Sequence, residues 1–204
     1  MDNPKYFKYG KKETEWLKSQ DPVLGAAINR IGHIRRTVNP DLFSALINSI
    51  VGQQISTKAQ ITVWNRMQER FKPLRAETIG AASPEDLQSC GISMRKAHYI
   101  KGIAEAVLDG SLDLAQLNKL SDEDVCKRLI QIKGIGVWTA EMLMIFSMQR
   151  KDILSWGDLA IQRGLRILYK KREITPKLFD KYKKRYSPYA SVASLYLWTI
   201  SGEA

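Results

Sequence analysis

Apolar residues recur every three or four positions along most of this chain, and that spacing is typical of amphipathic α-helices. Between residues 42 and 51, for example, apolar pairs at 42–43, 46–47 and 50–51 fall on one helical face. No segment shows the strict alternation of apolar and polar residues that a half-buried strand requires. The pattern therefore predicts an all-α fold.

Capping residues mark several helix boundaries. An Asp-Pro pair at 21–22 and Ser-Pro pairs at 83–84 and 187–188 place a side-chain acceptor before a helix and a proline in its first turn. We therefore expect a helix to begin at each pair, the last helix of the chain being capped at 187–188. Another helix is predicted over 57–72, with Ile61 on its buried face.

The segment 129–158 differs from the rest because two apolar helical stretches flank a glycine turn. The first helix ends near Ile132, and a second, apolar nearly all round, runs over 137–148. Two glycines separated by one residue at a helix N-terminus leave main-chain N–H groups uncovered, and the helix dipole there favours an anion. The turn is either a phosphate-binding site or only a tight connection between helices. Its candidate phosphate-binding residues are Lys133, Gly134, Gly136 and Val137.

A second candidate phosphate contact precedes the helix predicted after residue 93. Ser93, Arg95 and Lys96 place a hydroxyl and two cations at a helix start, where the helix dipole disfavours positive charge. A bound phosphate would explain this arrangement, and so would a solvated basic turn.

Asp158 is the carboxylate that follows the glycine turn, at the start of a helical pattern over 159–169. Capping that helix would by itself explain an aspartate here. The cap is compatible with a chemical role, because a helix N-terminus stabilises the anion. We therefore expect a carboxylate held in fixed relation to the phosphate-binding turn, and Asp152 is the alternative carboxylate.

Composition narrows the class of partner. The chain has 204 residues and a net charge of +11, an excess that suits binding to nucleic acid. Its two cysteines, Cys90 and Cys126, are far apart in the sequence, which excludes an all-cysteine zinc or iron–sulfur site and suggests buried thiols in a reducing compartment. No apolar run approaches the length of a membrane span, and the first residues contain no apolar signal core. We expect a cytoplasmic protein associated with the nucleoid and not with a membrane.

The string LIQIKGIGVWTA at 129–140 resembles the helix-hairpin-helix of the DNA glycosylase superfamily known as HhH-GPD. An aspartate about twenty residues further on and the string GQQIS at 52–56 extend the resemblance, which covers roughly residues 40–200 and is to the compact 3-methyladenine DNA glycosylase II type. It implies an all-α fold of two helical lobes with a cleft between them. Residues 38–148 would form a helical barrel that carries the hairpin, and residues 1–37 with 149–204 would form the lobe that carries the catalytic aspartate.

The resemblance also assigns chemistry. The string WGDLAIQR is similar to the segment around the catalytic aspartate of alkylpurine glycosylases, which gives Asp158 that role. Trp138 occupies the position of the Schiff-base lysine of bifunctional members, so cleavage of the DNA strand is not expected. Trp138 and Trp198 would line the base pocket and stack on cationic alkylated purines, at about 1–3 kcal/mol each. Packing in the core is the alternative for both tryptophans.

Two further assignments follow from the resemblance. Gln53 or Gln54 would enter the space left by a flipped base, although relatives often carry an apolar residue there. A monovalent cation, Na⁺ or K⁺, would be held by main-chain carbonyls of the hairpin. Relatives usually have proline at the position of Lys133, and they often have an aspartate at that of Gly157 and an arginine at that of Ala190. The carbonyls of the cation site would be those of Ile130, Ile132 and Ile135.

The sequence therefore predicts a monofunctional DNA glycosylase of base excision repair. It would flip alkylated purines such as 3-methyladenine and 7-methylguanine out of double-stranded DNA and hydrolyse the N-glycosidic bond, leaving an abasic site. We expect a monomer without a catalytic cofactor or an iron–sulfur cluster. The alternatives are a glycosylase for another damaged or mismatched base, and a non-catalytic module that binds lesions.

Overall fold

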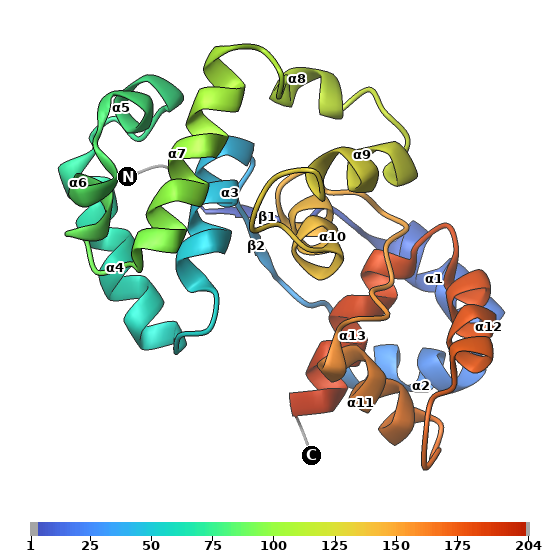
Figure 1. Ribbon diagram of the computed structural model, residues 1–204. Coiled ribbons are helices and arrows are strands. Elements are labelled where there is room, and N and C mark those ends of the chain that lie inside the picture. The colour runs from blue at the N-terminus through green and yellow to red at the C-terminus, as the bar shows by residue number, and fades with distance from the viewer. Residues whose placement is uncertain (1–3, 203–204) are drawn as a thin grey trace. The chain divides into compact units, whose positions relative to one another are not determined.

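The computed structural model describes residues 4–202, and in this range the chain forms thirteen α-helices and a single pair of two-residue strands (Figure 1). The prediction of an all-α fold is therefore confirmed. None of the helices in this range is long and apolar enough to cross a membrane. The elements in chain order are β1 Lys5–Tyr6, α1 Lys11–Gln20, α2 Pro22–Ile31, β2 Thr37–Val38, α3 Leu42–Gly52, α4 Thr57–Arg70, α5 Ala76–Ala81, α6 Pro84–Gln88, α7 Met94–Leu108, α8 Leu114–Leu117, α9 Asp122–Leu129, α10 Val137–Phe146, α11 Leu159–Leu168, α12 Pro176–Tyr186 and α13 Ala190–Gly202.

Contacts within the chain divide it into two compact units. The central unit is Asn39–Leu143, and the terminal unit combines the residues up to Val38 with those from Met144 onward. Helix α10 begins in the central unit and ends in the terminal unit, so the unit boundary falls inside a helix.

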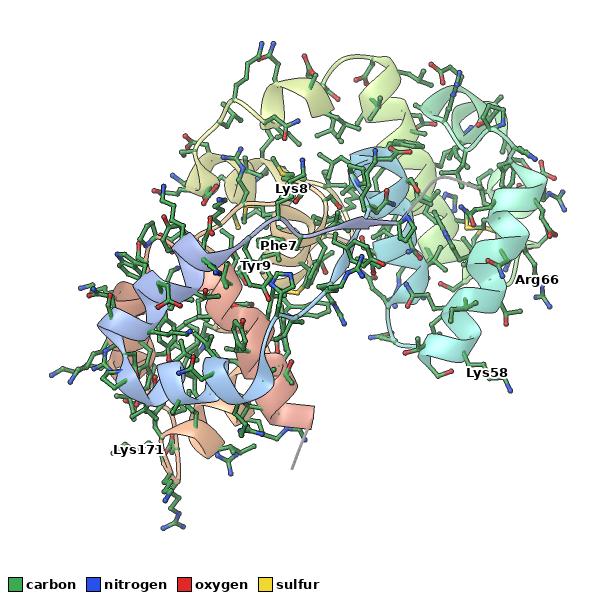
Figure 2. The ribbon with its side chains drawn as sticks, turned by 180° about the vertical axis from the view of Figure 1, so that it is seen from behind. Phe7, Lys8, Tyr9, Lys58, Arg66 and Lys171 are labelled. Carbon is green, nitrogen blue, oxygen red and sulfur yellow. The ribbon has the colours of Figure 1, made fainter. Side chains whose placement is uncertain are left out.

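In the central unit, α7 packs against α3, α5 and α6, and α3 also packs against α4. The apolar face predicted for residues 42–51 is buried on α3, and α7 buries Ile100, Ile103 and Ala104. On α4, however, Val63 rather than Ile61 is buried, and Ile61 is 56% exposed, so the predicted inward face of that helix was wrong at this position. Lys58 and Arg66 also lie on α4 (Figure 2).

In the terminal unit, α11 packs along α13, and α1 packs along α2. Helix α13 carries no charged residue within its range and is buried from Ala190 to Leu197, which makes it the core helix of this unit. Helices α11 and α13 approach closely at Gly164, where a Cβ would lie 2.3 Å from the carbonyl oxygen of Leu197. Glycine at this position is therefore a requirement of the helix crossing.

The strand pair was not predicted. Lys5 pairs with Val38 and Tyr6 with Thr37 in antiparallel register. Two residues per strand are too few to produce a recognisable alternation of apolar and polar positions. Beyond β1, the hydroxyl of Tyr9, the residue labelled in Figure 2, bonds both the N–H and the carbonyl of Ile34.

The predicted start of the last helix was also wrong. Ser187 is the C-cap residue of α12, and α13 begins at Ala190. The Ser187 hydroxyl donates to Asp152, whose other carboxylate oxygen accepts the N–H of Ala190 at 3.2 Å. The first turn of α13 is therefore capped by a side chain distant in the sequence, which a local Ser-Pro signal cannot reveal.

Candidate active site

Asp158 is the N-cap residue of α11, as its place in the sequence predicted. Its backbone is extended, and its Oδ1 accepts the N–H groups of Ala160 and Ile161, each at 2.9 Å. The side chain is buried, with 6% of the residue exposed. A carboxylate in this position receives two hydrogen bonds and the favourable field of the helix N-terminus.

The second oxygen of the same carboxylate is held by a tryptophan. The indole Nε1 of Trp198, on α13, donates to Oδ2 of Asp158 at 3.2 Å. The indole ring in turn lies 5.4 Å from the ring of Phe146, tilted by 34°. Both oxygens of Asp158 are thus hydrogen-bonded, and the plane of the carboxylate is fixed from two helices.

The sequence did not reveal this contact between Asp158 and Trp198, because forty positions separate the two residues and only the packing of α11 on α13 joins them. The available signal was Gly164, a glycine inside an otherwise regular helical pattern, which can mark a close approach of two backbones. On the same pair of helices, Nε of Arg163 donates to the Ser201 hydroxyl at 2.7 Å.

A carboxylate fixed in this way is suited to electrostatic catalysis. It can stabilise a positive charge that develops on a bound substrate, and it needs no reorganisation at the moment of reaction. It can also orient or deprotonate a water molecule within hydrogen-bonding reach. Asp152, the alternative carboxylate, is instead bonded to Ser187 and to the N–H of Ala190, so its described contacts are structural.

The glycine turn of the central unit joins α9 to α10 as predicted. Gly134 has φ +92°, and a Cβ there would lie 2.5 Å from Cδ2 of Tyr99. At Gly136, by contrast, a Cβ would meet no described atom within 4 Å. The first glycine is therefore required by the fold, whereas the second leaves open space at the start of α10, where Val137 is 53% exposed.

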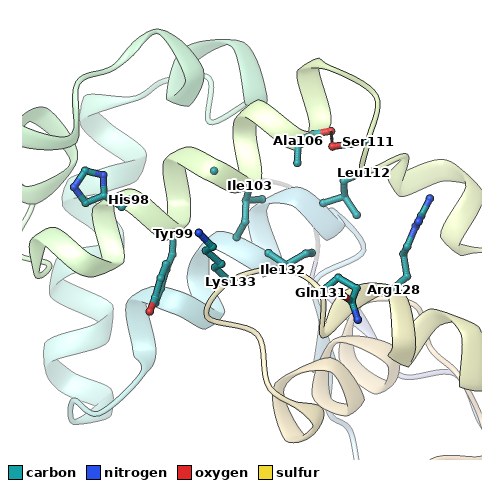
Figure 3. Close-up of a pocket in the computed structure, with 11 residues that line it drawn as sticks. His98, Tyr99, Ile103, Ala106, Ser111, Leu112, Arg128, Gln131, Ile132 and Lys133 are labelled. Carbon is teal, nitrogen blue, oxygen red and sulfur yellow. Dashed lines mark hydrogen bonds between the residues drawn. The ribbon is translucent and has the colours of Figure 1, made fainter.

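A pocket of about 440 Å³ lies beside this turn within the central unit. Figure 3 shows Ile132 and Lys133 of the turn on one side of it and Tyr99 and Ile103 of α7 on the other. Lys133 and Arg128 give the pocket two cationic side chains, so the surface next to the turn is positively charged.

The second predicted phosphate contact has a different local environment. Ser93 caps α7 by accepting the N–H of Lys96 at 3.3 Å, and Arg95 is exposed. The Lys96 ammonium donates to the carbonyl of Val51 at 2.9 Å and to that of Gln53 at 2.6 Å. Lys96 therefore has main-chain partners inside the protein.

Residues 47–188, more than half of the chain, match the family model described as HhH-GPD superfamily base excision DNA repair protein. The chain belongs to the HhH-GPD superfamily. The resemblance found in the hairpin string and around Asp158 is thereby confirmed, together with the fold class.

Individual relatives within the superfamily agree with this assignment. DNA-3-methyladenine glycosylase 1 of Schizosaccharomyces pombe is 36% identical over 78% of this chain and 72% of its own length. A crystal structure of DNA-3-methyladenine glycosidase from Bacillus halodurans superposes with a TM-score of 0.88 at 38% identity, covering 97% of this chain and 93% of that one.

A second solved relative was determined with DNA. The S. pombe 3-methyladenine DNA glycosylase in complex with abasic DNA superposes with a TM-score of 0.77 at 32% identity, covering 93% of this chain and 96% of that one. Measured against three curated relatives, this HhH-GPD chain spans between 58% and 72% of their length.

Some family assignments stay predictions. Trp138 is 48% exposed in the first turn of α10, and its contact with a base is untested. In the hairpin, the carbonyl of Ile132 accepts the N–H of Ile135 at 3.0 Å. A carbonyl oxygen has two lone pairs, so this bond is compatible with a cation at the same oxygen. Among residues 4–202, no cluster of three or more His, Cys, Asp or Glu side chains could hold a metal ion.

Proposed function

We propose that this protein is a monofunctional DNA glycosylase that hydrolyses the N-glycosidic bond of alkylated purines and leaves an abasic site. The observation that carries the proposal is the buried carboxylate of Asp158, held through both oxygens by the start of α11 and by Trp198. Membership of the HhH-GPD superfamily and the names of the relatives support it.

Asp158 would act on the sugar side of the bond. Departure of the base leaves an oxocarbenium-like sugar, and a carboxylate anion fixed nearby lowers the energy of that cation. The same carboxylate would orient, or take a proton from, the water that completes hydrolysis. Alkylation at N3 or N7 gives the purine a positive charge, so it leaves without a dedicated general acid.

Double-stranded DNA is the proposed partner. The net charge of +11 suits a polyanion, and the open space at Gly136 leaves room for a phosphate near the start of α10. Lys133, Ser93 and Arg95 are proposed as further phosphate contacts on the central unit. A monovalent cation on the hairpin carbonyls would stabilise the turn. We also propose that the protein acts as a monomer at the nucleoid, in the cytoplasm, where its substrate would lie.

Two tryptophans are proposed to recognise the extruded base. An indole attracts a cationic purine through stacking and cation–π interaction. Trp198 is only partly buried although it bonds Asp158, and Trp138 is half exposed, so each retains accessible ring surface. Trp138 cannot form a Schiff base, and the expected product is therefore an intact strand with an abasic site.

The test is release of free base from a methylated DNA duplex, followed by gels run with and without alkali. Wild-type protein should release 3-methyladenine and give strand breaks only after alkali. Asp158→Asn should lower excision by about 10²–10³-fold while DNA binding is retained. Asp152→Asn is the matched control, because that aspartate also bonds a helix N-terminus in the same unit, and its excision rate should stay near that of the wild type.

Each other outcome would reject part of the proposal. Breaks without alkali would indicate a lyase and contradict the inference from Trp138. Release of a different base alone would change the substrate class. DNA binding with no base release from any lesion would favour a non-catalytic module.

A further inference from the structure

Lys96 has an unusual position for a lysine, in the first turn of α7. The helix dipole disfavours a cation there, but the Lys96 ammonium lies against the C-terminal end of another helix. It donates to the carbonyl of Val51, in the last turn of α3, and to that of Gln53, the C-cap residue of α3. The last carbonyls of a helix have no hydrogen-bond partner within that helix. Lys96 supplies a partner to these two, and its positive charge complements the dipole at the C-terminus of α3.

Gln53 is held a second time, by its side chain. Its Nε2 donates to the carbonyl of Gly134 in the hairpin turn at 2.7 Å. The turn that follows α3 is thus tied to α7 through a main-chain carbonyl and to the hairpin through a side-chain amide. Both ties lie within the central unit and meet at one residue.

The packing beneath these bonds brings the same three elements together. A Cβ on Gly134 would lie 2.5 Å from Cδ2 of Tyr99 on α7 and 3.0 Å from Cδ1 of Ile50 on α3. The hairpin turn therefore rests directly on α3 and α7. Relative movement of the two turns would have to break hydrogen bonds and open this contact.

The next residue has the opposite character. Gln54 is exposed and has φ +57°, in the left-handed region that residues other than glycine seldom occupy. Such a conformation costs about 1–3 kcal/mol and persists where the surroundings determine it. Here the two hydrogen bonds on Gln53 hold the backbone in this conformation, and they leave the side chain of Gln54 at the surface.

We propose that Lys96 is a positioning residue which, through Gln53, fixes the exposed Gln54 at a set distance from the hairpin turn, and that Gln54 is the residue that enters the duplex. This proposal rests on the proposed function. Flipping a base requires a grip on the backbone and an insertion into the stack at the same time. If the spacing between the backbone contact and the inserted residue is already fixed, binding does not have to pay the entropy of ordering them.

The proposal assigns Lys96 an indirect role in place of the predicted direct contact with phosphate. Two of the three N–H donors of its ammonium are already used by carbonyls. Burial, with a smaller effect from the neighbouring charge of Arg95, lowers the pKa of Lys96, as expected of a cation drawn under the surface.

The chain offers a closely matched control on the same helix. Lys101, also on α7, donates to the carbonyls of Gly80 and Ala82. These occupy the same places on α5 that Val51 and Gln53 occupy on α3, namely the residue before the last and the C-cap. Replacement of Lys101 therefore removes the same kind of bond without touching the turn that carries Gln54.

The experiment compares single-turnover excision of a lesion opposite its normal partner with excision of the same lesion opposite an abasic analogue. The unpaired lesion costs less to extrude, so it depends less on the insertion. Lys96→Met should lower the paired rate about tenfold more than the unpaired rate, as expected for loss of a charge-assisted hydrogen bond. Lys101→Met should change both rates equally, and Lys96→Arg should restore the wild-type ratio.

Gln53→Ala and Gln54→Ala complete the set. Gln53→Ala should reproduce the effect of Lys96→Met on the ratio of paired to unpaired rates. The double variant should lower that ratio little further, because both residues hold the same turn. Gln54→Ala should lower the paired rate with unchanged thermal stability. If Lys96→Met does not fold, Gln53→Ala, which removes the side-chain amide but no charge, decides the question.

A second readout separates this proposal from the proposed function. 2-Aminopurine placed next to the lesion becomes more fluorescent when its neighbour leaves the stack, whether or not that neighbour is excised. A rise with wild-type protein and a smaller rise with Lys96→Met at saturating protein would support the positioning role even if no base were released. Equal fluorescence, or equal loss of the paired and unpaired rates in Lys96→Met, would overturn it.

Discussion

The crossing of α11 and α13 gives the sharpest test of how Asp158, the proposed catalytic residue, is held. Gly164→Ala would place a Cβ 2.3 Å from the carbonyl oxygen of Leu197 and 2.9 Å from its carbonyl carbon. Both atoms belong to the main chain of a buried helix and cannot rotate away. Restoring ordinary contact requires the helices to separate by about 1 Å.

The energetic result follows from two opposing terms. Forcing an extra methyl group into a packed interior costs about 1–3 kcal/mol. The strained contact here is with backbone, so the upper end applies, while alanine in a helix interior regains about 1 kcal/mol over glycine. The net loss is about 2 kcal/mol, which for a chain of this size lowers Tm by about 4–8 °C. Excision should also fall, because the Asp158–Trp198 bond spans the same two helices.

Thermal unfolding followed by circular dichroism measures the first effect. Gly102→Ala is the matched control, because Gly102 lies inside α7 and a Cβ there would meet no described atom within 4 Å. That variant should gain about 0.5–1 kcal/mol and melt a few degrees higher. A Gly164→Ala protein that melted at or above the wild-type temperature would refute the argument from close packing.

Three further substitutions test other parts of the structure. Burial favours a higher pKa for Asp21, but hydrogen bonds from neighbouring side chains outweigh it and lower the pKa. The stability that the Asp21 carboxylate contributes is therefore complete above about pH 4 and is lost as the pH falls toward its pKa in the folded protein. Between pH 6 and pH 3, the urea midpoint of Asp21→Asn should therefore change less than that of the wild type. Gly134→Ala, with φ +92° and Tyr99 2.5 Å away, should lower the free energy of unfolding in urea by at least about 1–2 kcal/mol and weaken DNA binding, measured by titration. Trp198→Phe removes the indole donor to Asp158 and should slow single-turnover excision about tenfold with DNA affinity retained.

The parts of the fold that the sequence predicted are those set by neighbouring residues. Caps act over two or three positions, and helical faces repeat every three or four, so Asp158 as a cap and the helices flanking the glycine turn could be inferred. The hairpin string and its spacing to the aspartate were specific enough to identify the superfamily, which the family model confirms.

The remaining features depend on contacts between distant segments. The bond from Trp198 to Asp158 joins residues 40 positions apart, and the cap that Asp152 provides to α13 joins residues 38 positions apart. Lys96 shows the same limit, because a cation at a helix start is equally compatible with a phosphate and with the end of another helix. Only the packing of the helices distinguishes these two partners of Lys96, and the periodicity of a sequence does not show which helix packs against which.

The lysines that bond carbonyls also change how the net charge of the protein translates into salt dependence. Each phosphate contact on DNA releases a counterion, and the slope of log affinity against log salt counts those contacts. Lys96 and Lys101 contribute to the +11 total but direct their ammonium groups at the main chain. Such charges add to the long-range attraction toward DNA, yet they displace few counterions on contact. The formal charge therefore overstates the salt sensitivity that this protein will show, and association should be favoured more strongly than the number of direct phosphate contacts suggests.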